Sequence, residues 1–257
     1  MTLRQLLPAP QDSPGLTDAD LTDAGLAALY AYPDGRWLRA NMVSSADGAA
    51  TLAGASAGLS SDTDRRLFAL LRTLSDVILV GAATVRTERY KPARAALEPW
   101  RDLREGRTPT PPIAVVTRRL DLDPDSPLIT AAPADARTIV ITTAQAPPDI
   151  RAALEPHADV IVAGEEGVDF KAAVAALAER GHRRLLAEGG PHLLAELLAA
   201  GLLDELCLTV GPLMAGPGPG RIVTGPRPDG AQPLNLAHVL AEDGFLFCRY
   251  TRKTHDH

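Results

Sequence analysis

The chain has 257 residues, of which 46% are apolar, and this is enough to bury the core of one large domain. With 26 Lys and Arg against 32 Asp and Glu, the net charge is −6, so the composition gives no general attraction to nucleic acid or to an anionic membrane. No apolar run approaches the roughly 18 residues that span a bilayer, and the opening MTLRQLLPAPQDSPG lacks the features of a signal peptide. We expect a cytoplasmic protein that has neither nucleic acid nor a membrane as its partner.

Residues 1–35 are rich in Pro and Asp and contain one helical candidate, Thr17–Tyr30, which Thr17 could cap. We interpret this segment as an N-terminal arm that packs on the main domain or on a neighbouring subunit. Residues 36–257 then form the domain itself.

From Arg36 onward, short β-like runs alternate with helical runs. The predicted strands are Leu38–Ser44, Val77–Val80, Ile113–Thr117, Thr138–Thr142, Val160–Ala163, Arg184–Ala187, Glu205–Val210, Leu236–Ala241 and Phe245–Arg252. The predicted helices are Asp62–Leu74, Asp149–Leu154, Asp169–Arg180 and Pro191–Ala200. Strands separated by helices favour a parallel sheet that is covered on both faces, while the tight turn at Glu242–Gly244 pairs the last two strands antiparallel. The pattern predicts one α/β domain with a mixed, mostly parallel sheet of about eight or nine strands flanked by helices.

Two segments fit no regular element. Arg86–Pro112 is long, charged and contains prolines, and Met214–Arg221 is a Gly/Pro tract that follows an apolar run. Long loops in a compact domain often carry function, although a surface excursion without function is the alternative.

The two cysteines, Cys207 and Cys248, lie in apolar, strand-like runs. No CxxC or Cys/His spacing occurs, so the sequence predicts no metal site. Two buried, reduced thiols are expected rather than a disulfide framework.

The stretch Arg184–Leu194, RLLAEGGPHLL, turns a buried strand into a helix through Glu188 and two glycines. Gly189 and Gly190 allow positive φ and a close approach of a ligand to their amides, and Pro191 suits the first turn of a helix. The amides that follow favour an anion at the helix N-terminus, which makes a pyrophosphate cradle plausible beside a purely structural turn. Since ligands of open α/β sheets bind beyond the carboxyl ends of the strands, the Glu188 carboxylate is a candidate for ligand contact.

A second notable stretch is Asn41–Ser61, in which a strand ends at Asp47-Gly48 and small residues follow. Asp47-Gly48 is by itself an ordinary turn signal. In the helix that begins after Ser61, Arg65 and Arg72 lie seven residues apart on one face. Arg65 suits an exposed position, whereas Arg72 ends an apolar run and could reach from a buried helix into a cleft.

At this point four motifs resemble one known family. They are NMVSSADG (41–48), RRLFALLRTLSDVILVGAATV (65–85), LLAEGGPHL (185–193) and LLDELCLTVGPLMAG (202–216). Their order and separation resemble the reductase domain of bifunctional riboflavin-biosynthesis enzymes in a stand-alone form, over roughly residues 36–252. The resemblance implies a dihydrofolate-reductase-like fold. The zinc deaminase half of those enzymes needs H-x-E and P-C-x-x-C, and neither occurs here.

The resemblance also implies roles for individual positions. Substrate contacts are implied for Asn41, Asp47, Ser56, Arg72, Arg94 and Glu188. Contacts to NADPH are implied for Gly58, Gly81, Thr84, Glu88, Gly189, Gly190, Pro191, His192, Leu193 and Leu194. Arg118 or Arg119, just past the strand that ends at Thr117, can meet the 2′-phosphate of NADPH, with a solvated basic pair as the alternative.

The chain departs from the family on the substrate side. The family usually has Asp-Asp-Pro or Asp-Asn-Pro after Thr-Val, whereas this chain has Glu88-Arg89-Tyr90. The arginine that commonly follows is displaced by about one position if it is Arg94, many bacterial members have Lys at position 41, and an aromatic residue is common near Gly58. These changes bear on the identity of the substrate more than on NADPH binding.

The resulting prediction is an NADPH-dependent reductase of a ribosylamino-pyrimidine phosphate, which delivers hydride to C1 of the sugar imine. Glu188 or Asp47 could assist proton transfer. A reductase of a pterin or dihydrofolate-like heterocycle on the same fold is one alternative, and a non-catalytic NADP-binding sensor is another. The family is commonly homodimeric, so we expect a homodimer in which Leu236–Ala241 and Phe245–Arg252 form or adjoin the interface.

Overall fold

The computed structural model describes residues 3–7, 21–96 and 98–253. Its strands are β1 Arg4–Leu7, β2 Trp37–Ser45, β3 Val77–Gly81, β4 Ile113–Val116, β5 Ile139–Thr142, β6 Asp159–Val162, β7 Arg184–Ala187, β8 Glu205–Gly211, β9 Leu234–Glu242 and β10 Phe245–Arg252. Its helices are α1 Asp23–Leu29, α2 Asp62–Leu74, α3 Ala82–Thr87, α4 Pro127–Thr130, α5 Pro148–Leu154, α6 Phe170–Glu179 and α7 Pro191–Ala199, with short 3₁₀ turns η2 at Ala57–Leu59 and η3 at Arg101–Arg104.

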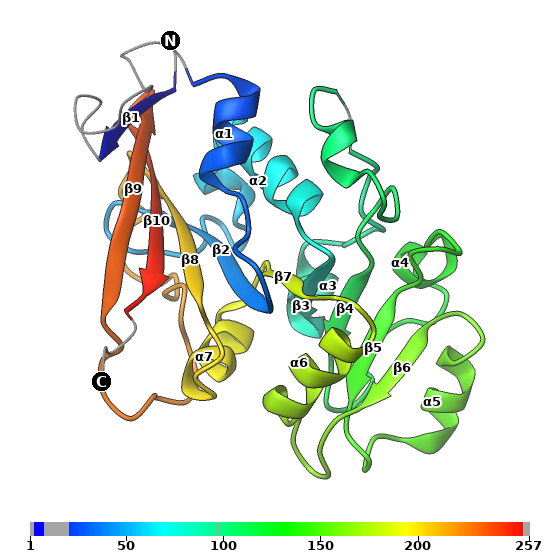
Figure 1. Ribbon diagram of the computed structural model, residues 1–257. Helices are drawn as coiled ribbons and strands as arrows, with labels where there is room; N and C mark the ends of the chain where they lie inside the picture. The colour runs from blue at the N-terminus through cyan, green and yellow to red at the C-terminus, as the bar shows by residue number, and fades with distance from the viewer. Residues whose placement is uncertain (1–2, 8–20, 97, 254–257) are drawn as a thin grey trace.

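The strands form one ten-stranded sheet in the order β1-β9-β10-β8-β2-β7-β3-β4-β5-β6 (Figure 1). The seven strands from β8 to β6 in this order are parallel, and β10, β9 and β1 add antiparallel pairs at one side. The Asp243-Gly244 turn has two positive φ angles, 49° and 82°, as a tight hairpin of this kind requires. The predicted mixed, mostly parallel α/β sheet is confirmed.

The prediction of about eight or nine strands was one strand short. The tenth strand is β1, whose residues we had assigned to the N-terminal arm, and it pairs antiparallel with β9. The predicted helix Thr17–Tyr30 is shorter, since α1 begins at Asp23 and Thr22 caps it by accepting a hydrogen bond from the amide of Gly25. The position assigned to Thr17 as a cap lies outside the described residues.

Helices cover both faces of the sheet. The core on one face joins α1 and α2 to β3, β8, β9 and β10, and it includes Leu26, Tyr30, Leu70, Leu71 and Phe247. The core on the other face joins α6 and α7 to β2, β3 and β5, and it includes Leu38, Leu177, Leu194 and Leu197. This packing holds α2 and α7 against the sheet (Figure 1). Their N-termini lie next to the carboxyl ends of the central strands.

A buried ionic cluster lies on the α1 face between β2, β8 and β10. Arg39 and Glu205 face each other in the parallel register of β2 and β8, and both side chains are 0% exposed. Glu205 accepts from Arg39 Nε at 2.6 Å, from Arg249 Nε at 2.8 Å and from Trp37 Nε1 at 2.8 Å. Burial opposes the charge of Glu205, but the two arginines outweigh it and lower the pKa of that carboxyl to about 2.

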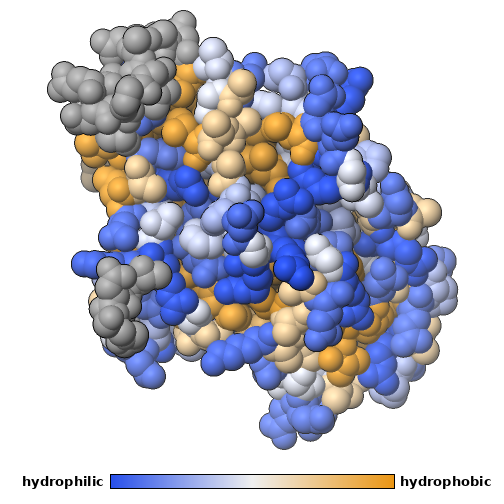
Figure 2. Space-filling view, viewed as in Figure 1, coloured by the Kyte–Doolittle hydropathy of each residue, from blue (hydrophilic) through white to orange (hydrophobic). Residues whose placement is uncertain are grey.

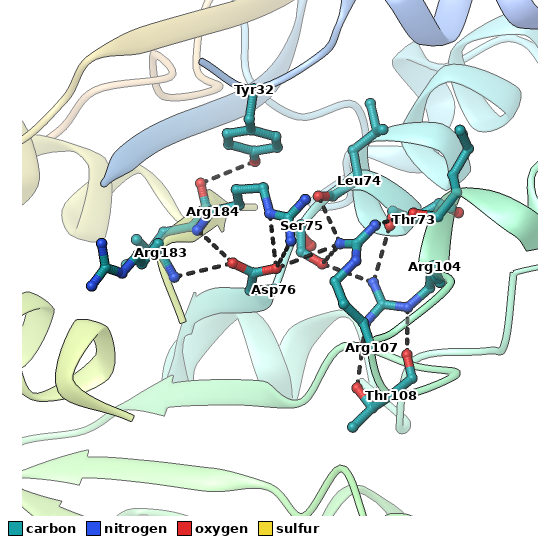
Figure 3. A network of polar contacts seen from close by, with 12 residues as sticks. Tyr32, Thr73, Leu74, Ser75, Asp76, Arg104, Arg107, Thr108, Arg183 and Arg184 are labelled. Carbon is teal, nitrogen blue, oxygen red and sulfur yellow. Dashed lines mark hydrogen bonds and ion pairs between the residues drawn. The ribbon is translucent and has the colours of Figure 1, made fainter. Parts of the chain in front are cut away.

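A second polar network holds the amino ends of the parallel strands (Figure 3). Asp76, just before β3, accepts from the amides of Arg183 and Arg184 and from the Arg184 guanidinium, at 2.8–3.1 Å. Arg104 and Arg107 donate to the last carbonyls of α2, at 2.8–3.1 Å. The far end of the Arg86–Pro112 segment is therefore attached to the end of α2.

Both cysteines are free and buried, as expected. Among the described residues no cluster of His, Cys, Asp and Glu could hold a metal ion. In the same part of the chain no helix is long and apolar enough to cross a membrane.

Candidate functional site

The carboxyl ends of β2, β3, β7 and β8 meet at one edge of the sheet, where two neighbouring cavities lie. The first, here called the glycine cavity, has a volume of about 470 Å³ and is lined by Asn41–Val43, by the 50–60 loop, by α2 and α3, and by the turn Glu188–Pro191. The second, here called the basic cavity, has a volume of about 720 Å³. Its cationic lining residues are Arg66, Arg72, Arg89, Lys91, Arg94 and Arg104. Ser56, Phe68, Glu88 and Tyr90 line both cavities and so form the wall between them.

Glu188 lies between the cavities and is paired with Arg72. Glu188 Oε1 accepts from Arg72 Nε and Glu188 Oε2 from Arg72 Nη2, both at 2.6 Å, while Tyr90 donates its hydroxyl to Oε2 at 2.9 Å. The Glu188 side chain is 1% exposed, against 23% for Arg72. Glu188 lines the glycine cavity and Arg72 the basic cavity, so this pair connects the two.

Burial and pairing fix the charge state of the arginine. Burial works against the Arg72 guanidinium, but Glu188 outweighs it and holds the pKa of Arg72 above its ordinary value. The guanidinium also stacks against Phe68, with its carbon 4.3 Å from the ring centre. Arg72 also lines the basic cavity, where its positive charge would attract an anionic group.

The glycine turn connects β7 to helix α7. Gly189 has φ of +104°, which favours glycine, and the peptide bond between Gly189 and Gly190 is cis. Helix α7 begins at Pro191, and its first intrahelical hydrogen bond runs from the amide of Leu194 to the carbonyl of Gly190. The amides of His192 and Leu193 therefore precede the helical ladder and point out of its N-terminus.

Gly190 lies close to α3. A Cβ at Gly190 would lie 2.5 Å from Thr84 Oγ1, so only glycine fits there without a shift. Gly81 lies at the end of β3 beside the turn, and its amide donates to the carbonyl of Gly189 at 3.0 Å. Of the predicted cofactor contacts, the structure brings Thr84, Glu88, Gly189, Gly190 and Pro191 together in the lining of the glycine cavity. His192 is exposed beside the cavity, while Leu193 and Leu194 are buried in the core, so only their backbone can face a ligand.

The predicted substrate residues Asn41, Ser56 and Arg94 line different parts of the two cavities. Asn41 lines the glycine cavity, Ser56 lines both cavities, and Arg94 is an exposed residue of the basic cavity. Ser56 donates its amide and its hydroxyl to Glu88 Oε1, at 3.2 and 3.1 Å. Gly58, which was predicted as a cofactor contact, is exposed on η2, where a Cβ would approach Leu52 at 3.1 Å, and it lines neither cavity.

Asp47 lies outside the lining of both cavities. Its carboxylate accepts from the hydroxyl of Ser45 and from the amides of Ala215 at 3.1 Å and Gly216 at 2.8 Å. The hydrogen bond from Ser45 and those from the two amides lower the pKa of Asp47 to about 2. These contacts attach the Gly/Pro tract Met214–Arg221 to the end of β2.

The basic pair near β4 also lies away from the two cavities. Thr117 is buried and accepts the amide of Asp121 at 3.2 Å, while Arg118 and Arg119 are exposed. Arg119 lines a separate hollow with Asp121 and Asp149. Since β7, β3 and β4 are neighbours in the sheet, β4, after which Arg118 follows, lies two strands, or about 10 Å, from β7.

Two site features were missed from the sequence. Tyr90 and Phe68 flank Arg72 and line both cavities, but neither had been singled out as a site residue. The departure at Glu88-Arg89-Tyr90 was a signal for Tyr90, because it marked a position where a hydroxyl replaces a proline of the family pattern. Phe68 gave no signal, since an aromatic residue on an amphipathic helix is ordinarily read as core.

The fold is that of a pyrimidine-reductase-like α/β protein. A pyrimidine reductase-like protein from Corynebacterium diphtheriae matches the structure with a TM-score of 0.78 and 28% identity, over 90% of this chain and 99% of that chain. The family model of the RibD C-terminal domain matches residues 36–243, and the chain belongs to that family.

Two relatives carry the name 2,5-diamino-6-ribosylamino-4(3H)-pyrimidinone 5′-phosphate reductase. The Archaeoglobus fulgidus protein is 32% identical over 160 residues, which cover 62% of this chain and 71% of that protein. The Methanothermobacter thermautotrophicus protein is 29% identical over 221 residues, which cover 83% of this chain and 96% of that protein.

Proposed function

We propose that this protein is an NADPH-dependent reductase of a ribosylamino-pyrimidine phosphate in riboflavin biosynthesis. The names of its relatives support the substrate class and the reaction. The observation that carries the proposal is the Arg72–Glu188 pair, which joins a cavity beside a glycine-lined anion cradle to a cavity lined by six cationic side chains. A substrate with a heterocycle at one end and a phosphate at the other matches that pair of cavities.

The substrate is proposed to bind across the wall between the cavities. Its heterocycle takes the glycine cavity, where Asn41 and Glu188 offer polar contacts, and its phosphate takes the basic cavity near Arg72 and Arg94. Ser56 lies at the passage between them. The basic cavity favours this phosphate ester over an uncharged pterin, because desolvating several cations without an anion is unfavourable.

The residues of the glycine turn fit a dinucleotide. A side chain at Gly190 would overlap Thr84. The amides at the N-terminus of α7 are free to donate to an anion such as a pyrophosphate. The residues proposed to hold NADPH are Gly58, Gly81, Thr84, Glu88, Thr117, Arg118, Gly189, Gly190, Pro191, His192, Leu193 and Leu194. Arg118, about two strands away, is proposed to meet the 2′-phosphate. When bound, NADPH supplies the hydride that adds to C1 of the sugar imine.

The proposed role of the chain in the chemistry is to orient the imine. When hydride adds to the imine carbon, the electron pair of the C=N bond moves to nitrogen, and that nitrogen takes a proton from solvent, which yields the ribitylamino product. Of the two carboxylates considered, Glu188 belongs to the lining of the glycine cavity, whereas both oxygens of Asp47 accept backbone amides elsewhere. We therefore assign substrate orientation to Glu188 and the attachment of the Gly/Pro tract to Asp47.

The assembly is proposed to be a cytoplasmic homodimer. Figure 2 shows hydrophobic side chains on the left of the molecule, over β1 and β9. The exposed large apolar residues of these strands and of β10 are Leu6, Leu7, Leu234, Leu236 and Leu246. An apolar face at the antiparallel side of a sheet suits an interface between two copies. A monomeric mass in sedimentation at micromolar concentration would contradict this assembly.

The decisive test of function is NADPH oxidation with defined substrates. We expect turnover with the 2,5-diamino-6-ribosylamino-pyrimidinone 5′-phosphate or its deaminated uracil counterpart, and none with dihydrofolate. Tight binding of NADPH without oxidation by either phosphate would overturn the proposal in favour of a sensor.

A further inference from the structure

Tyr90 stands where the family usually has a proline. The pattern has proline at this position, after two acidic or amide residues, whereas this chain has Glu88-Arg89-Tyr90. A proline has no hydroxyl and can donate no hydrogen bond.

The Tyr90 hydroxyl is a permanent donor to Glu188. It lies 2.9 Å from Glu188 Oε2. Burial first, and then the neighbouring Glu188 carboxylate, raise the pKa of Tyr90 well above its ordinary value. The hydroxyl keeps its proton across the range in which an enzyme works, so its hydrogen bond to Glu188 persists.

The hydrogen bonds of Glu188 leave one acceptor position open. A carboxylate offers about four lone-pair positions, two on each oxygen. Oε2 accepts from Arg72 Nη2 and from Tyr90, so both of its positions are filled. Oε1 accepts only from Arg72 Nε among the described residues. The open position is therefore on Oε1. Without the Tyr90 hydroxyl, Oε2 would have an open position as well.

The Tyr90 ring contributes separately to the wall between the cavities. Its centre lies 5.7 Å from the Arg72 guanidinium carbon, and Phe68 lies against the same guanidinium at 4.3 Å. Two rings therefore hold the Arg72 side chain while Glu188 fixes its charge. Both rings line both cavities, so a ligand that reaches from one to the other passes beside them.

We propose that Tyr90 is a positioning and specificity-determining residue, which holds Glu188 so that a single carboxylate oxygen receives one donor of the heterocycle. This inference rests on the proposed function, because it names how that same site selects its substrate. The 2-amino pyrimidinone and the 2-oxo uracil differ in the donors that they present at one ring position. Freeing Oε2 from Tyr90 adds an acceptor and changes the preference between them.

The experiment is a double-mutant cycle of Y90F and E188Q, with Y250F as the matched control. Y90F keeps the ring and removes the hydroxyl, and Tyr250 is a partly buried tyrosine on β10 that lines neither cavity. We expect Y90F to lower kcat/KM about tenfold, which corresponds to about 1.4 kcal/mol, to leave the Kd of NADPH within about twofold, and to shift the ratio of kcat/KM between the two substrates by at least about threefold. In the E188Q background Y90F should change kcat/KM by less than about twofold. Equal effects of Y90F in both backgrounds, or an unchanged substrate ratio, would overturn the inference.

A measurement without substrate separates this inference from the proposed function. The Nε–H resonance of Arg72 reports its hydrogen bond to Glu188, and we expect Y90F to shift that resonance while Y250F leaves it in place. Absence of turnover in the unmutated protein together with this shift would refute the function and retain the positioning role. Turnover together with an unmoved resonance and an additive cycle would refute Tyr90 and retain the function.

Discussion

Gly190 lies so close to Thr84 that a substitution there can test the proposed anion cradle. Gly190 has φ of −80°, which alanine adopts freely, so Gly190→Ala introduces no backbone strain. The added Cβ would lie 2.5 Å from Thr84 Oγ1, and relieving that overlap should lower stability by about 1–3 kcal/mol, or roughly 2–12 °C in melting temperature. If a diphosphate oxygen also needs this space, the Kd of NADPH should rise at least about tenfold, or about 1.4 kcal/mol.

A second substitution separates the two effects. With Thr84→Ala present, the nearest atom to the new Cβ is the Cβ of residue 84, at 3.9 Å, which is an ordinary contact. The double variant should therefore regain the melting temperature of Thr84→Ala alone while its NADPH affinity stays at least about tenfold weaker. Calorimetric titration of NADPH and thermal melting on all four proteins give the answer. If the double variant binds NADPH as well as Thr84→Ala does, Gly190 is there to accommodate Thr84, and the cradle assignment is wrong.

Three further predictions address the site and the fold. Glu188→Gln should lower turnover about tenfold or more and leave the affinity for NADPH nearly unchanged. The rate must be measured well below the melting temperature of the variant, because loss of the carboxylate charge also weakens the pair with Arg72. An unchanged rate would mean that Glu188 is only a structural partner of Arg72. The double variant Arg118→Ala/Arg119→Ala should show a smaller preference for NADPH over NADH in steady-state kinetics than the parent does. If neither protein prefers NADPH over NADH, these arginines do not contact a 2′-phosphate. Burial lowers the pKa of His238 from 6.5 to about 4, so the unfolded chain takes up this proton first, and about 3 kcal/mol of stability should be lost as the pH falls from 6.5 to 4. The free energy of unfolding, measured with urea, should fall more steeply with decreasing pH in the parent than in His238→Phe. Parallel plots of this free energy against pH would contradict the prediction.

Most of the sheet could be predicted because its strands are apolar runs between clear breakers. Strand β1 was missed because RQLL is short and largely exposed, and its partner β9 lies more than 200 residues away. Helix α3 was missed because GAATVRT has small residues where an apolar stripe would normally mark a helix. Both elements are determined by tertiary contacts that no local window contains.

The site could be predicted as a location but not as a set of contacts. The glycine turn and Glu188 follow from residues that are adjacent in the sequence, so their meeting at a strand end was predictable. The partner of Glu188 is 116 residues away at Arg72, and the amides that Asp47 accepts are 168 and 169 residues away. The sequence pattern singled out Glu188 and Arg72, and the family resemblance added Asp47, but neither could decide which of these side chains pair with each other and which face a ligand.

The position of β2 in the middle of the sheet has a consequence for the protein during its synthesis. Both neighbours of β2 come late in the chain, and Arg39 and Glu205, which face each other, are 166 residues apart. At about 5–20 residues per second, a ribosome needs roughly 8–33 seconds between these two residues. Until β7 is made, this central strand has two unpaired edges, and until Glu205 is made, its arginine has no carboxylate. Residues 36–45 of the nascent chain are therefore a strand that can pair wrongly with another chain until β7 and β8 emerge.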